Sequence, residues 1–187
     1  MHAYQVEVEA HPTFQDGAFL EDQLYAYSVE QTGYDDGKYL TLWVKSPTGE
    51  RLAGLHGWTW GGSCYIQDLW VQKALRAQGY GTQLLHEAEQ EARTRGCHHM
   101  VLSSFSFQAP GFYQKLGYDV FAVLEDHPRH HRHYYLHKRV KPRRAPAFGP
   151  ARHWRFAGGA LTPPLTKGML TPPWNPSIRF PALTDGA

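Results

Sequence analysis

The stretch Val71-Gln72-Lys73-Ala74-Leu75-Arg76-Ala77-Gln78-Gly79-Tyr80-Gly81-Thr82 decides the fold of this 187-residue chain. The segment before it is rich in β-branched and aromatic residues, as strands are. After it, Leu84, Leu85, Ala88 and Ala92 recur at the spacing of one helical face. The stretch therefore leaves a strand and opens a helix, whose first amide groups lack partners and carry the positive end of the helix dipole.

Such a turn predicts an anion site. Gly79 and Gly81 lack the Cβ atoms that would keep phosphate oxygens from the backbone, and Arg76 can add a charge-assisted contact. Two other nucleotide motifs do not fit, because there is no GxxxxGK[ST] and the third glycine of a dinucleotide fingerprint is missing. An ordinary helix start that happens to contain two glycines is the alternative interpretation.

The rest of the chain up to residue 140 alternates between strand and helix patterns. We expect helices over 14–31, from 79 to about 95, and over 110–116. We expect strands over 3–9, 39–44, 52–60, 63–72, 98–105, 118–124 and 134–140. The order β-α-β-β-β-α-β-α-β-β predicts an α/β (α+β) chain, in which helices cover the faces of a mixed sheet.

Two motifs together resemble a known family. Arg76-x-x-Gly79-x-Gly81 is similar to the Q/R-x-x-G-x-G/A signature of the GNAT N-acetyltransferase superfamily, and Phe112-Tyr113-Gln114-Lys115-Leu116-Gly117-Tyr118 is similar to its FY-x-K-LG-F/Y segment. Segments 57–62 and 106–113 resemble a bacterial subgroup of small-molecule type. The resemblance implies the GNAT fold, a mixed and mostly antiparallel sheet of six to seven strands flanked by helices.

The resemblance also implies acetyl-CoA as cosubstrate and no metal. The pyrophosphate would lie on a loop formed by Arg76, Ala77, Gln78, Gly79, Tyr80, Gly81 and Thr82. Backbone groups of the preceding strand would bind the acetyl carbonyl and the pantetheine amide, and these belong to Leu69, Trp70 and Val71.

Tyr113 is the residue that the resemblance places at the departing thiolate. A phenol can donate to a thiolate, and a short helix beside the cofactor strand would aim it. The alternative is a core aromatic, because Phe112 and Leu116 lie four residues apart and share a packing face with it.

The acceptor side is less defined. Asp68 is the carboxylate on the strand expected to carry the acyl group, so it is a candidate for the base that activates the amine. Glu30, near the end of the first helix, is a second acidic candidate. Trp58 and Trp60 share one strand face and are candidates for a wall against the substrate. Solvated acids and core-filling tryptophans are the alternatives.

The distribution of charge, proline and cysteine indicates how the chain is divided and what it can bind. Residues 1–140 carry a formal charge of −4 and residues 141–187 carry +6, with nine of the 13 prolines in the second part. We expect an acetyltransferase domain over 1–140 and a Pro-rich basic tail over 141–187 that is disordered or docked on the domain. Cys64 and Cys97 form no disulfide framework, and no stretch suits a membrane. We expect a cytoplasmic monomer or homodimer that binds neither nucleic acid nor membranes.

The histidines of residues 126–133 invite a metal interpretation, but no cysteine or carboxylate is spaced to complete a tetrahedral set. We therefore predict acetyl transfer to a primary amine of a small cationic substrate. An aminoglycoside of the kasugamycin type, acetylated on a 2′-amine, is the specific hypothesis. The alternatives are acetylation of a peptide or protein amine and a non-catalytic module that binds acetyl-CoA.

Overall fold

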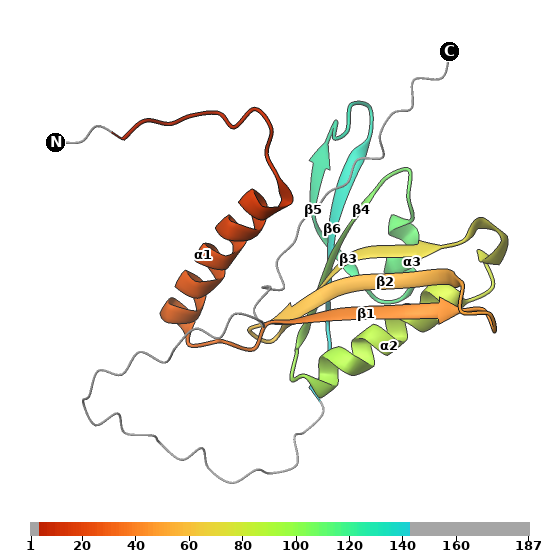
Figure 1. Cartoon of the computed structure of the whole chain (residues 1–187). Coiled ribbons are helices and arrows are strands. Elements are labelled where there is room, and N and C mark those ends of the chain that lie inside the picture. The colour runs from red at the N-terminus through yellow and green to blue at the C-terminus, as the bar shows by residue number, and fades with distance from the viewer. Residues whose placement is uncertain (1–3, 143–187) are drawn as a thin grey trace, which may run out of the picture.

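One six-stranded sheet organises the computed structural model, which describes residues 4–142 (Figure 1). The strand order is β1-β2-β3-β4-β6-β5. The pairing is antiparallel everywhere except between β3 and β4, which run parallel. The strands are β1 (Lys38–Lys45), β2 (Arg51–Trp60), β3 (Ser63–Val71), β4 (His99–Phe105), β5 (Asp119–Glu125) and β6 (Arg132–Arg139).

Three α-helices and one short 3₁₀ helix accompany the sheet. They are α1 (Phe14–Thr32), η1 (Lys73–Leu75), α2 (Tyr80–Thr94) and α3 (Pro110–Lys115). Helix α2 packs on β1, β2 and β3, while α1 stands to one side of the sheet in Figure 1. The predicted apolar stripe of α2 is confirmed, because Leu84, Leu85, Ala88 and Ala92 are all buried.

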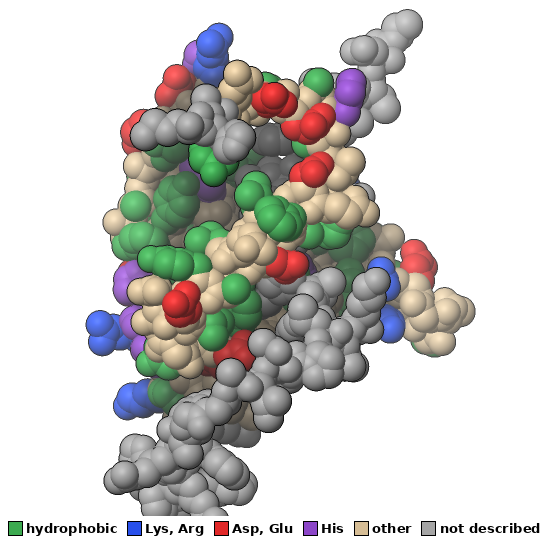
Figure 2. All heavy atoms as spheres, turned by 60° about the vertical axis from the view of Figure 1, so that its left-hand side comes forward, with side chains coloured by type: hydrophobic (Ala, Val, Ile, Leu, Met, Phe, Trp, Pro, Cys, Tyr) green, Lys and Arg blue, Asp and Glu red, His purple; other side chains and the backbone are tan. Residues whose placement is uncertain are grey.

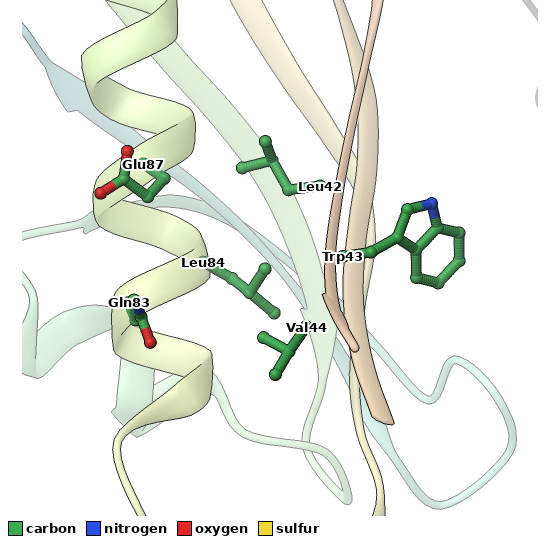
Figure 3. Close-up of a pocket in the computed structure, with 6 residues that line it drawn as sticks. All are labelled: Leu42, Trp43, Val44, Gln83, Leu84 and Glu87. Carbon is green, nitrogen blue, oxygen red and sulfur yellow. The ribbon is translucent and has the colours of Figure 1, made fainter. Parts of the chain in front are cut away.

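The core lies on the side of the sheet that faces α2 and α3. In β1, Leu42 and Val44 point toward Leu84 of α2, whereas Trp43 points to the other side of the strand (Figure 3). The small pocket between these residues is lined mainly by apolar groups and belongs to the packing of α2 on β1. We call the opposite side of the sheet the outer face. It carries the side chains that alternate with the core residues along each strand.

A β-bulge interrupts this alternation in β3. The ladder with β2 pairs His56 with Asp68 but Gly57 with Ile66, so Gln67 is the extra residue. Before the bulge Ile66 is buried in the core, and after it Leu69 packs against the core. Asp68 consequently lies on the outer face.

The bulge coincides with a parting of β3 and β4. Their parallel ladder runs from Ser63 opposite His99 to Ile66 opposite Leu102 and then stops. Beyond that level β3 continues to Val71 against β2, and β4 continues against β6. Residues 67–71 thus keep ladder partners on one edge only, and we call the region beyond the last β3–β4 pair the opening.

The predicted first strand is wrong. Residues 4–9 form no regular element and are exposed, with Val6 and Val8 almost fully accessible to solvent. Alternating apolar and polar residues suit a strand, but a strand also needs a neighbouring edge, and these residues enter no ladder in the described sheet. The sheet of the described residues has six strands, within the expected six to seven.

Helix α1 has the predicted bounds to within one residue, but it buries none of its residues. The apolar residues that define its pattern lie largely in solvent: Phe19, Leu20, Leu24 and Tyr27 are each exposed. The half-buried positions include Ala18, Glu21, Tyr25 and Ser28, which recur at helical spacing and define a different face. The apolar pattern predicted the helix and not the face that packs.

The predicted domain boundary lies close to the end of the described part. Strand β6 ends at Arg139, and the Val140 amide still donates to the His98 carbonyl at 3.0 Å. The tail predicted over 141–187 lies outside the described residues apart from its first two positions, so that division stays a prediction. Within residues 4–142 no helix is long and apolar enough to cross a bilayer.

Candidate active site

The stretch quoted first does join a strand to a helix. After β3 the chain makes the η1 turn, and Ala77 and Gly79 both take positive φ values, of 61° and 88°. Gly79 is the N-cap of α2, and no side chain caps this helix. A Cβ at Gly79 would meet nothing within 4 Å. The first amides of α2 thus have no side-chain cap, and amides left without a cap are the groups that anion sites at helix starts use.

The two glycines of the loop have different surroundings. A Cβ at Gly81 would lie 3.4 Å from the ring of Phe112 and 3.8 Å from Val71. The start of α2 therefore lies beside α3 and β3 at Gly81, and the part that this glycine plays in phosphate binding stays a prediction. Arg76 is held at the end of β3, where its Nε donates to the Val71 carbonyl at 3.1 Å.

Tyr113 lies next to this packing contact and is buried, with 9% of its surface exposed. Its ring meets the rings of Phe112 and Tyr118 edge-on, at centroid distances of 5.1 and 6.1 Å. Burial raises the pKa of Tyr113 to about 12. Its hydroxyl has no hydrogen-bond partner among residues 4–142, so it stays protonated and keeps a donor to offer.

On the outer face a histidine lies across from Asp68. His56 of β2 is the ladder partner of Asp68, and its Nδ1 lies 2.8 Å from the Thr41 hydroxyl oxygen. Tyr39 stacks on the imidazole at a centroid distance of 5.6 Å. Sequence reasoning missed His56, although the period-2 alternation that pairs Trp58 with Trp60 puts it on the same face.

The two predicted tryptophans are engaged by the protein itself. Trp58 is 9% exposed and stacks on Tyr65 at 5.4 Å. The Nε1 of Trp60 donates to the Tyr34 carbonyl at 2.9 Å, which ties the loop after α1 to the end of β2. Most of the Trp58 surface thus lies in packing contacts, and its part in substrate binding stays a prediction. Trp70, by contrast, is half exposed on the outer face.

The acidic residues of α1 and of the loop after it differ in whether they lie near the outer face of β1. Burial raises the pKa of Tyr39, and the negative charges of Glu21 and Asp22 raise it further, so both lie near the outer face of β1. Glu30 is exposed and lies nine residues after Glu21, half a turn around the helix. The structure therefore does not bring Glu30 to the sheet. Asp36 accepts a hydrogen bond from the Gly61 amide at 2.9 Å.

Figure 2 shows the side of the molecule on which α1 lies. Acidic and hydrophobic side chains are interspersed there. A face of this composition suits a substrate that combines positive charge with apolar surface.

Aromatic and histidine rings continue the outer face toward β5. His133 stacks on Phe105 at a centroid distance of 4.1 Å, and Phe105 stacks on Phe107 at 5.3 Å. In the part of the chain that is described, no three His, Cys, Asp or Glu residues are grouped to hold a metal. Cys64 and Cys97 are buried free thiols, and burial raises the pKa of both.

Comparisons with known proteins agree with this geometry. The chain is 33% identical over 105 residues to the acetyltransferase Atu2258 of Agrobacterium fabrum, which covers 56% of this chain and 77% of that protein. It is 39% identical over 84 residues to a blasticidin-S acetyltransferase of Streptomyces morookaense, which covers 43% of this chain and 60% of that protein.

Among solved structures, an acetyltransferase from Bacillus cereus superposes with a TM-score of 0.62 at 34% identity. The match covers 72% of this chain and 98% of the other. The sequence profile of the acetyltransferase (GNAT) family matches residues 4–118, well over half of the chain. The chain belongs to the acetyltransferase (GNAT) family and is an N-acetyltransferase.

Proposed function

We propose that the chain transfers the acetyl group of acetyl-CoA directly to a primary amine of a small cationic substrate. The observation that carries this proposal is the parting of β3 and β4 at the Gln67 bulge, close to the uncapped start of α2. One edge of β3 is left with unpaired backbone groups there, and a linear amide-bearing chain such as pantetheine can pair with them.

In this proposal acetyl-CoA lies along a path from the start of α2 to the opening between β3 and β4. The pyrophosphate lies at the amides of residues 77–82, beside Arg76. Pantetheine then runs along the free edge of Leu69, Trp70 and Val71, which brings the thioester toward the bulge. In support of this path, Arg76 is hydrogen-bonded to Val71, so the arginine and the edge of β3 form one continuous surface.

Tyr113 assists the departing sulfur. Its hydroxyl is protonated across the working pH range, because burial raises its pKa to about 12. It lies on the α3 side of the sheet, next to Phe112, which contacts the start of α2. A protonated hydroxyl without a partner among the described residues can donate to a thiolate that appears during the reaction.

The amine approaches from the outer face. Asp68 lies there at the level of the opening, and the carboxylates of Glu21 and Asp22 lie above β1. These negative charges favour a cationic acceptor. Asp68 remains a proposed participant in amine activation, while the acidic contribution of α1 comes from Glu21 rather than from Glu30.

An antibiotic amine is the substrate class we favour. The relative named blasticidin-S acetyltransferase is 39% identical over its matched part, which supports this class. An aminoglycoside of the kasugamycin type fits the same acidic face and is the second candidate. A peptide or protein amine is the remaining alternative in the class of N-acetyltransferases.

A thiol-release assay with acetyl-CoA tests this proposal. Blasticidin S, kasugamycin, a polyamine and peptides with free N-termini are supplied as acceptors, and CoA release is followed with a thiol reagent. We expect release that depends on a cationic small molecule and a product heavier by one acetyl group. The proposal would be contradicted if only peptides caused CoA release, or if none of the amines in a wider panel did.

A further inference from the structure

We infer that His56 is the group that takes the proton from the acceptor amine. This inference rests on the proposed transfer to an amine and adds the base that the proposal otherwise leaves to Asp68. Three observations carry it: the position of His56, the two contacts that hold its ring, and the charges around it.

The position follows from the sheet. His56 is the ladder partner of Asp68, the first residue after the Gln67 bulge. Neighbouring strands lie about 4.8 Å apart, so the imidazole stands one strand away from the opening between β3 and β4. Its side chain is on the outer face, opposite α2 and α3. An amine that reaches the acetyl carbon from this face therefore passes within reach of the imidazole, directly or through one water.

Two neighbours in β1 hold the imidazole. The hydroxyl oxygen of Thr41 lies 2.8 Å from Nδ1, and the ring of Tyr39 stacks on the imidazole at an interplanar angle of 27°. When Nδ1–H donates to the threonine oxygen, Nε2 keeps its lone pair and can accept a proton. The same hydrogen bond persists once the ring becomes an imidazolium. The contacts with Thr41 and Tyr39 are thus compatible with both the neutral imidazole and the imidazolium.

The groups around the ring are acidic or aromatic. Asp68 faces His56 from β3, Tyr39 faces it from β1, and the carboxylates of Glu21 and Asp22 act on Tyr39 from α1. Imidazole is in general the side-chain group most used to take up a proton near neutral pH.

The proton transfer to His56 comes before bond formation. The substrate ammonium gives one proton to Nε2 of His56, and the neutral amine forms a C–N bond with the thioester carbon. When the tetrahedral intermediate collapses, the C–S bond breaks, and the sulfur keeps the electron pair and takes the proton of the Tyr113 hydroxyl. The nitrogen loses its remaining excess proton to water, and the Tyr113 oxygen regains a proton from water. The products are the acetamide, CoA and one proton left on His56.

The test compares pH profiles of kcat/KM for the amine in wild type, His56→Gln and Asp68→Asn, with His86→Gln on the exposed side of α2 as control. The ratio of wild type to variant cancels the titration of the amine itself. We expect His56→Gln to lose roughly 100-fold at neutral pH. We also expect the ratio of wild-type to His56→Gln kcat/KM to become smaller as the pH falls from about 8 to 5, the range in which imidazoles titrate.

The remaining variants should behave differently. His86→Gln should match wild type, and Asp68→Asn should lower kcat/KM while keeping the acid limb. The assignment would be overturned if wild type and His56→Gln had the same kcat/KM at every pH. It would also be overturned if the fall of kcat/KM at low pH disappeared in Asp68→Asn and not in His56→Gln. If wild type acetylates no amine in the panel, the proposed function fails and not the role of His56 alone.

Thr41→Val provides a second variant in case His56→Gln does not fold, since valine suits an exposed strand position. Loss of the hydroxyl that contacts Nδ1 releases the ring, so the profile of kcat/KM should fall about 10-fold at neutral pH. An unchanged profile in Thr41→Val would contradict the positioning of the ring.

Discussion

At the scale of single residues, the two sides of the sheet supply different parts of the chemistry. Tyr113 offers a hydroxyl from the side of α3, where burial keeps it protonated. His56 and Asp68 face the outer side, where the acidic residues of α1 also lie. The acyl group between β3 and β4 would meet a donor on one side and a base on the other.

Tyr113→Phe tests the first of these roles. The variant keeps the buried ring, so we expect the Kd for acetyl-CoA to stay within about twofold, while kcat falls roughly 100-fold. Because the raised pKa favours the protonated phenol, wild type should show no loss from Tyr113 ionisation below about pH 12. Steady-state kinetics and calorimetric binding check both points, and an unchanged kcat would remove Tyr113 from the mechanism.

Sequence reasoning reached some of these residues and not others. Tyr113 stands in a motif that resembles one of the family, so it could be named as a candidate before its surroundings were known. His56 has no such motif, and its importance depends on which residue of β3 lies opposite. Glu30 was predicted from its place near the end of a helix. Only the structure shows that the face of α1 toward the sheet carries Glu21 instead.

At the scale of elements, the bulge in β3 positions the site. Gly57 lies where the ladder shifts, and a Cβ there would collide with the backbone carbonyl of Tyr65. The glycine is therefore required for β2 to follow β3 closely at the point where β3 leaves β4. Since backbone atoms form the obstacle, a side-chain rearrangement cannot relieve it.

Gly57→Ala should therefore destabilise the fold by about 2 to 3 kcal/mol. Gly17→Ala is the matched control, because a Cβ added at Gly17 in α1 would meet nothing within 4 Å, and alanine favours a helix. Urea denaturation should show a lower midpoint for the first variant and no lower midpoint for the second. Equal stability of Gly57→Ala and wild type would contradict the account of the bulge.

Local patterns predicted most of the elements but not the bulge. The bounds of β1 to β6 and of α1 to α3 agree with expectation to within two residues, because alternation, helical spacing, glycine and proline act locally. The bulge depends on the register of two strands, and neither strand alone contains that information. The parting of β3 and β4 depends on pairing between distant segments in the same way.

At the scale of the whole molecule, the proposal puts donor and acceptor on opposite sides of a single sheet. Helices α2 and α3 pack on one face, and with them the proposed phosphate loop and Tyr113. Helix α1 stands near the outer face with its apolar residues exposed. Residues 4–9 were predicted as a strand because they alternate, yet tertiary pairing decides whether such a segment joins a sheet, and here it does not.

The exposed N-terminal segment gives a prediction at this scale. Val6→Asp combined with Val8→Asp changes two fully exposed positions, so we expect Tm to stay within about 2 °C of wild type. The matched control is Leu55→Asp, which buries a charge in the core and should prevent folding or lower Tm severely. Differential scanning fluorimetry checks both, and a large loss in the double variant would mean that the segment packs as a strand.

The central claim is that the opening between β3 and β4 holds acyl-CoA for direct transfer. The crystal structure of a complex with a non-hydrolysable acetyl-CoA analogue tests it most directly. We predict the pyrophosphate on the amides of residues 77–82, pantetheine along residues 69–71, and the sulfur within hydrogen-bond distance of the Tyr113 hydroxyl. A sulfur atom outside the opening, or a pyrophosphate away from the start of α2, would contradict the account.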